Sequence, residues 1–85
     1  MPEISRFYGI IIRMFYNEHN PPHFHAEYGE YRVVFNFNDE VVIGFMPKRA
    51  LKLIFKWTKL HKDELIKNWG KCQKEDTPDK IRPLK

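Results

Sequence analysis

The stretch that decides the fold is His23–Asn36, which reads HFHAEYGEYRVVFN. Gly29-Glu30 suits a two-residue type II′ turn, since glycine accepts the positive φ of the first central position. This turn fixes the strand register, and one face of the resulting hairpin is apolar throughout: Tyr28 opposite Tyr31, Ala26 opposite Val33, and Phe24 opposite Phe35. Side chains alternate between the two faces of a strand. The stretch therefore predicts a β-hairpin with one face in the core.

The other face of this hairpin carries polar groups that the core does not require. The register places His23 opposite Asn36, His25 opposite Val34, and Glu27 opposite Arg32. Histidine titrates near neutral pH and is a common metal ligand. Two imidazoles and a carboxylate in one row are therefore a candidate site.

Further strands are predicted on both sides of the hairpin. Residues 7–16 are rich in aromatic and β-branched side chains and predict a strand, followed by a polar loop that ends in Pro21-Pro22. Val41–Phe45 predicts a last strand. We expect a three-residue loop, Asn38–Glu40, because it would place Phe37 opposite Val41 and Phe35 opposite Ile43 on the apolar face.

Residues 47–74 predict helix, with Pro47 tolerated in the first turn. Apolar residues recur at helical spacing: Leu51, Ile54, Phe55, Leu65, Ile66 and Trp69. A break near residues 60–63 allows either one bent helix or two consecutive helices. We expect residues 75–85 to form an extended or mobile tail. The predicted fold is a single α+β domain, 1–85, in which a four-stranded, mainly antiparallel sheet (1–46) is followed by helix packed on one of its faces.

The charge is divided unevenly along the chain. Residues 1–46 carry three basic and six acidic side chains, whereas residues 47–85 carry twelve basic and five acidic ones. The second half could therefore bind an anionic partner. The basic residues Lys48, Lys52, Lys56 and Lys59 share one face of the predicted helix and could contact nucleic acid or an acidic protein; a solvated helix face is the alternative.

The remaining features indicate an ordinary intracellular protein. Cys72 is the only cysteine, which excludes an intramolecular disulfide and a cysteine-based zinc site. Neighbouring lysines would lower the pKa of its thiol. The N-terminal residues lack the basic and apolar regions of a secretory signal, and the longest aliphatic run, Ile10–Ile12, is too short to span a bilayer. We expect a cytoplasmic location and no membrane association.

Catalysis is the first interpretation of the histidine row. His23 and His25 would act as general acid and base, with Glu27 orienting them. Arg13 and Arg32 would hold a phosphate, which suits metal-independent cleavage of RNA. Alternatively, both histidines are half-exposed strand residues that hydrogen-bond the proline loop.

Metal binding is the second interpretation. Imidazole and carboxylate groups from His19, His23, His25 and Glu27 are zinc-type ligands. Their spacing matches no standard zinc motif, however, so the sequence predicts no metal or other cofactor.

The chain also resembles a known family, catalogued as domain of unknown function 4160 and found in small bacterial and archaeal proteins. The resemblance rests on four parts of the chain: Pro2–Gly9, Asn20–Tyr28, Pro47–Leu51, and the spaced set Trp57, His61, Glu64, Leu65 and Trp69. It implies one component of a toxin–antitoxin-like pair, with a small partner protein encoded beside it. No catalytic residue can be carried over from it. One departure from the family pattern is Asn38–Glu40, which replaces a glycine-containing turn.

Overall fold

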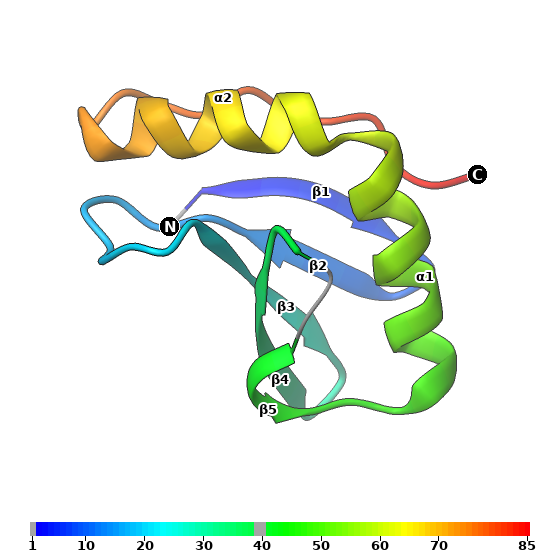
Figure 1. The fold of residues 1–85 in the computed structure, drawn as a ribbon. Helices are drawn as coiled ribbons and strands as arrows, with labels where there is room; N and C mark the ends of the chain where they lie inside the picture. The colour runs from blue at the N-terminus through cyan, green and yellow to red at the C-terminus, as the bar shows by residue number, and fades with distance from the viewer. Residues whose placement is uncertain (1, 39–40) are drawn as a thin grey trace.

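The computed structural model describes residues 2–38 and 41–85 and confirms the α+β class. Five strands precede two helices: β1 Glu3–Phe7, β2 Ile10–Arg13, β3 His23–Tyr28, β4 Tyr31–Asn36, β5 Val41–Phe45, α1 Lys48–Leu60 and α2 Lys62–Gln73. The strands pair antiparallel in chain order, from β1 to β5 (Figure 1). Each strand thus lies beside the strand that precedes it in the sequence.

The fifth strand arises because residues 7–16 do not form one strand as predicted. The chain turns at Tyr8-Gly9, so Phe7 ends β1 and pairs with Ile10 at the start of β2. Both turn residues have positive φ, 50° for Tyr8 and 81° for Gly9, as a type I′ hairpin requires. A tyrosine at the first of these positions gives little sequence signal for a turn.

The central hairpin has the predicted register. Tyr28 pairs with Tyr31, Phe24 pairs with Phe35, and the intervening residues follow in step. Gly29 has a φ of 59°, which agrees with the expected turn. Sequence pattern and turn chemistry therefore sufficed to define β3 and β4.

The predicted register of the last strand is wrong. Phe35 pairs with Val41 and not with Ile43, and Ile43 pairs with Val34. The predicted loop, Asn38–Glu40, extends outside the described residues. Strand β5 is exposed along its whole length, with Ile43 at 66% and Phe45 at 70% of full exposure. The predicted register assumed that the apolar residues of this strand face the core. Because the strand contributes no residue to the core, its apolar pattern could not predict the register.

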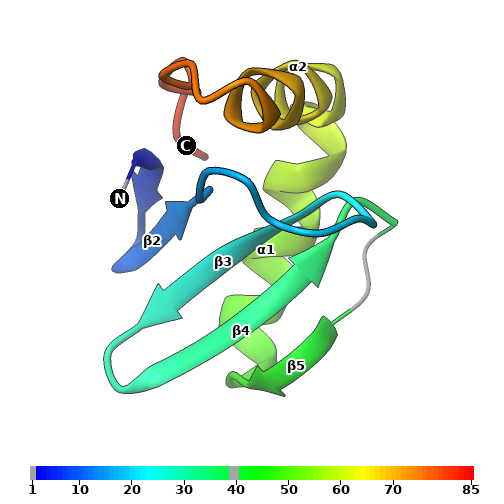
Figure 2. The same ribbon diagram turned by 90° about the vertical axis from the view of Figure 1, so that its left-hand side faces the viewer.

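Both helices cover the same face of the sheet, and α1 lies behind β3 and β4 in Figure 2. His61 separates them with a φ of −123°, so the two-helix alternative is confirmed. Trp57 of α1 is fully buried and contacts Phe24 of β3, with ring centroids 5.9 Å apart. Neither of the described helices is long and apolar enough to cross a membrane.

The C-terminal segment is extended and held against the core. The amide of Ile81 donates to the carbonyl of Ile4 over 2.7 Å, and the indole of Trp57 donates to the carbonyl of Arg82 over 3.0 Å. Asn68 of α2 holds Asp79 through two hydrogen bonds. Of the two alternatives for this tail, the structure shows the extended one.

Candidate functional site

The polar row of the hairpin lies on the face of the sheet opposite to Phe24 and Ala26. These two residues are fully buried, whereas the side chains of His23 and His25 are 14% and 26% exposed. The alternation along β3 produces this division, since successive side chains point to opposite faces. Both histidines are therefore half-buried and accessible.

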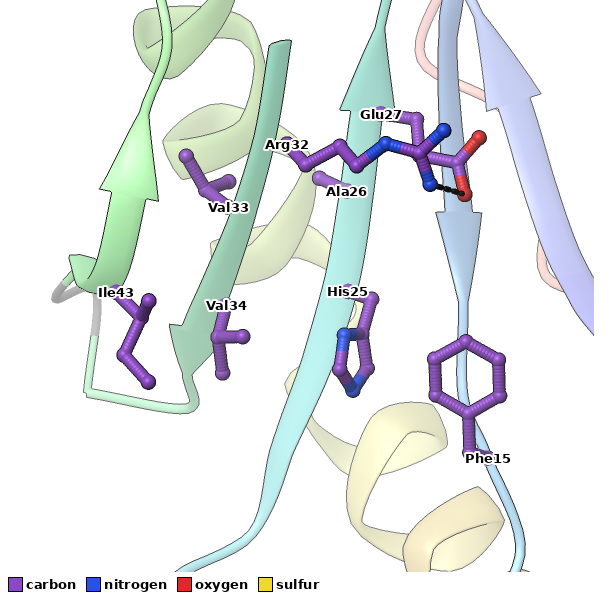
Figure 3. A pocket seen from close by; sticks show the side chains of 8 residues that line it. All are labelled: Phe15, His25, Ala26, Glu27, Arg32, Val33, Val34 and Ile43. Carbon is purple, nitrogen blue, oxygen red and sulfur yellow. Dashed lines mark ion pairs between the residues drawn. The ribbon is translucent and has the colours of Figure 1, made fainter.

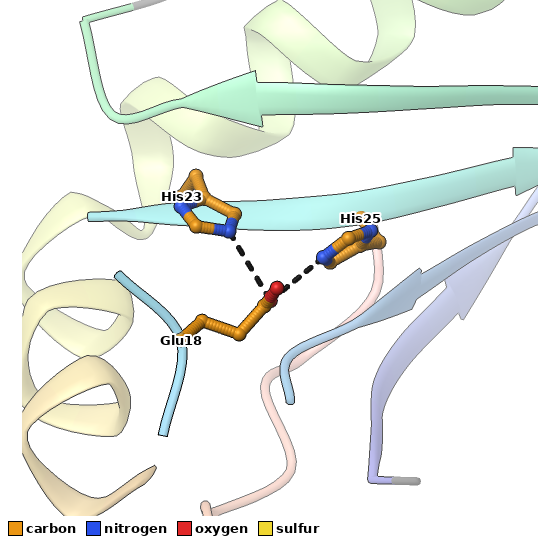
Figure 4. A group of neighbouring side chains, drawn as sticks. All are labelled: Glu18, His23 and His25. Carbon is orange, nitrogen blue, oxygen red and sulfur yellow. Dashed lines mark hydrogen bonds and ion pairs between the residues drawn. The ribbon is translucent and has the colours of Figure 1, made fainter. Parts of the chain in front are cut away.

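The carboxylate that contacts both imidazoles comes from Glu18, a residue that the sequence pattern does not single out. Its Oε1 atom lies 2.7 Å from His25 Nε2 and 3.1 Å from His23 Nε2 (Figure 4). Glu18 belongs to the loop between β2 and β3, and the chain reverses there. This reversal brings Glu18, five positions before His23, against the histidine side of β3. Its place in a polar loop beside the histidines was the only sequence signal for it.

Helix α2 holds the Glu18 loop in place. The side chain of Gln73 donates to the backbone carbonyl of Glu18 over 2.9 Å. The backbone N–H of Asn17 donates to the backbone carbonyl of Cys72 over 3.3 Å. The side-chain amide of Asn17 also donates to the Glu75 carboxylate. The cluster is thus assembled from the loop, β3 and the last turn of α2.

Ring contacts and one hydrogen bond orient the two imidazoles. His23 Nδ1 lies 2.8 Å from the Pro21 carbonyl, so the predicted bond to the proline loop is present for His23. The rings of His25 and Phe15 are 4.3 Å apart, and those of His23 and Trp69 are 5.1 Å apart. Such packing restricts the rotation of both rings, so the Nε2 atoms face Glu18 without a large entropic cost.

Glu27 interacts with the two arginines. Its carboxylate lies 3.0 Å from Arg13 Nε. It also lies 3.7 Å from Arg32 Nη1, the pair drawn in Figure 3. The arginine side chains differ in access, because Arg32 is 75% exposed and Arg13 only 24%. Glu27 therefore neutralises arginine charge at one end of the row, and Glu18 takes the orienting position that we had expected Glu27 to occupy.

A shallow groove runs along this face of the sheet. One part is lined by the Glu18–Pro21 loop, His23 and Val42, and the other by Phe15, Glu27 and Arg32; His25, Val34 and Ile43 line both parts. Figure 3 shows Val34 of β4 between His25 of β3 and Ile43 of β5. The imidazoles are thus reached through an open, partly apolar channel.

The Glu18 cluster can also hold a metal ion. One ligand atom from each of Glu18, His23 and His25 lies within 4.8 Å of the other two. Of the four candidate ligands considered from the sequence, His23 and His25 belong to this group. His19 and Glu27 are not in it, although His19 lines the same groove.

The basic residues of α1 form a second surface. Lys48, Lys52, Lys56 and Lys59 are all exposed, as is Arg49. Four of these five residues line a shallow hollow with Leu53 and Phe55: Arg49, Lys52, Lys56 and Lys59. The predicted basic residues of this helix are therefore solvent-exposed, and three of the four line one hollow.

Cys72 does not have the lowered pKa expected from its lysine neighbours. The residue is buried, and burial raises the pKa of its thiol, with a further contribution from the Glu18 carboxylate. A buried thiol with a raised pKa is a poor nucleophile at neutral pH.

These features define a class of small α+β protein, with two helices on one face of an antiparallel sheet and a histidine–glutamate cluster on the other. The family model for a domain of unknown function, DUF4160, matches residues 9–70 of the chain. The chain belongs to this family. The matched range includes all three residues of the cluster, together with α1. Searches of the curated proteins and of the solved structures found no match.

Proposed function

We propose that this chain is the RNA-directed component of a cytoplasmic, toxin–antitoxin-like pair and that RNA is bound on the His23/His25 face of the sheet. The observation that carries the proposal is the convergence of two imidazoles in an open groove, on the face of the sheet away from α1 and beside the last turns of α2. The Nε2 atoms of both imidazoles already lie within hydrogen-bonding distance of an anionic oxygen, that of Glu18. A protonated imidazole can donate to a phosphate oxygen in the same position.

The groove also supplies the other contacts that a single RNA strand needs. Arg32, with its exposed guanidinium, stands at one end and can reach a phosphate. The rings of Phe15 and His25 offer flat surfaces for a base to stack on. Arg13 is more enclosed and acts through its ion pair with Glu27.

If the bound RNA is cleaved, His23 and His25 are the groups that would transfer protons. Cleavage by attack of a 2′-hydroxyl needs one proton acceptor and one proton donor near the phosphate. Glu18 would orient the rings and would have to release at least one Nε2 atom to the substrate. Glu27 would maintain the position of the arginines.

The experiment is RNA binding and cleavage by purified protein, with growth on expression as a second readout. We expect the His23→Ala/His25→Ala variant to lose at least tenfold in RNA affinity and to relieve any growth arrest. His61→Ala is the matched control, because His61 also pairs with a glutamate, Glu64, but lies on the helical side. Equal activity of the double variant and the parent would exclude this face.

A partner protein is part of the same proposal. The exposed apolar side chains of β5 support it: Val42 at 53%, Ile43 at 66% and Phe45 at 70% of full exposure. An edge strand with such side chains is a surface on which another chain can add a strand. The test is co-purification with the small protein that we expect to be encoded beside this one. Ile43→Lys should abolish co-purification. Ile66→Lys should keep it, because Ile66 is an exposed apolar residue of α2, away from β5.

The basic face of α1 favours a second candidate function, binding without chemistry. Five basic and no acidic residues lie in this helix of 13 residues. Binding of nucleic acid there should weaken steeply with salt, because each phosphate contact releases counterions. A Lys52→Glu/Lys56→Glu variant should then bind less RNA, and His23→Ala/His25→Ala should bind as the parent does. The reverse pattern would support the histidine face.

A further inference from the structure

We infer that Glu18, His23 and His25 form a binding site for a divalent transition-metal ion of the zinc type. This inference goes beyond RNA binding and does not depend on it. It rests on the convergence of three ligand atoms, the hydrogen bond behind one of the imidazoles, and the way in which the cluster is held.

The ligand atoms are close to the spacing that zinc requires. Zinc binds imidazole nitrogen and carboxylate oxygen at about 2.0–2.2 Å, which places tetrahedral ligands about 3.3–3.6 Å apart. The two nitrogens lie 2.7 and 3.1 Å from Glu18 Oε1, and all three ligand atoms are within 4.8 Å of one another. Small rotations of the Glu18 side chain, which is 28% exposed, would lengthen the two oxygen–nitrogen distances to this range.

The hydrogen bond of His23 prepares its Nε2 atom to act as a ligand. A carbonyl oxygen can only accept, so the bond to Pro21 requires the hydrogen of His23 to be on Nδ1. In a neutral imidazole, Nε2 then carries a lone pair, and this lone pair faces a carboxylate oxygen. Two acceptors face each other unless a cation lies between them. Metal-binding histidines commonly donate their other N–H to a backbone carbonyl in this way.

The surroundings favour a site with an accessible position. Phe15 and Trp69 pack against the two imidazoles, and Gln73 holds the backbone of Glu18. The groove along the sheet leaves the cluster open on one side. Two histidines, one glutamate and an open fourth position form a ligand set that suits a reactive zinc ion more than a purely structural one.

The test is a titration of untagged protein with Zn²⁺ and with Co²⁺, in the absence of RNA. We expect one ion per chain, a rise in the melting temperature, and the visible absorption bands of tetrahedral Co²⁺. Glu18→Gln keeps the size of the side chain and should lower Zn²⁺ affinity at least tenfold. His25→Ala should do the same and also abolish the Co²⁺ bands.

His19→Ala is the matched control, because His19 lines the same groove outside the cluster. Its affinity for Zn²⁺ should be that of the parent. The inference is overturned if Glu18→Gln and His25→Ala bind Zn²⁺ as the parent does, or if His19→Ala weakens binding equally. In that case a proton on His23 Nε2 satisfies the carboxylate and the cluster is an ion pair only. RNA binding is measured separately, so its failure would leave this result unchanged.

Discussion

The two hydrogen bonds between Asn68 and Asp79 predict how much the C-terminal tail stabilises the fold. The Asn68 side chain is only 1% exposed, and its amide donates to the Asp79 carbonyl over 2.8 Å. Its oxygen accepts from the Asp79 amide over 2.9 Å. The tail beyond this point buries Ile81 against the sheet, at 4% exposure. Asn68→Ala removes both bonds at once.

The expected cost follows from these contacts. Each net hydrogen bond contributes about 0.5–1.5 kcal/mol, and a buried group left without a partner adds to the loss. We expect Asn68→Ala to lower the free energy of unfolding by about 2–4 kcal/mol. The cost has an upper limit, because the tail can detach from the domain. Water then hydrogen-bonds the backbone groups of Asp79, and the loss is instead the burial of Ile81, about 1.5–3 kcal/mol. For a domain of this size the melting temperature should fall by roughly 10–25 °C.

Denaturant titration followed by circular dichroism measures this change, and α2 offers two controls. Gly70→Ala lies two residues further along the helix, where an added Cβ meets nothing within 4 Å, and should stabilise the protein by about 0.5–1 kcal/mol. Lys71→Ala removes the surface ion pair with the Asp79 side chain and should have little effect. A change of less than about 0.5 kcal/mol in Asn68→Ala would refute the reasoning.

Further predictions concern strand geometry, the thiol and acid stability. Gly44→Ala should cost about 3 kcal/mol or more, because φ is +100° and the new Cβ would clash with the Arg32 carbonyl oxygen. Gly29→Ala, at φ +59° in open space, should cost only about 1–2 kcal/mol by the same denaturant assay, and equal losses would contradict this. Burial raises the pKa of the Cys72 thiol, so alkylation at neutral pH should be slow until denaturant is added; rapid labelling of the folded protein would show that the thiol is accessible. The hydrogen bond from Lys71 lowers the pKa of Asp79, so Asp79→Asn should be slightly less stable than the parent above the ordinary carboxyl pKa of 3.8, and this small difference should vanish as the pH falls below it.

Local sequence rules were enough to predict the central hairpin and the helical region. The alternation along His23–Asn36 and the glycine at position 29 defined the central hairpin residue by residue. The helical spacing after Pro47 indicated the helical region, and the choice between one bent helix and two helices was settled by the structure. For the hairpin, a single buried face and a short connection left one arrangement that satisfied both the core and the turn.

The sheet edges and the composition of the site depend on long-range packing that the sequence pattern does not show. At one edge, Tyr8-Gly9 forms a turn with little sequence signal, and at the other, β5 lies outside the core that would have fixed its register. The histidines could be assigned to one face from the pattern of β3. Their carboxylate could not, because Glu18 reaches them from a loop held by Gln73, 55 residues further along the chain. Strand alternation places neighbours in sequence on a known face, whereas a contact across a loop depends on how distant elements pack.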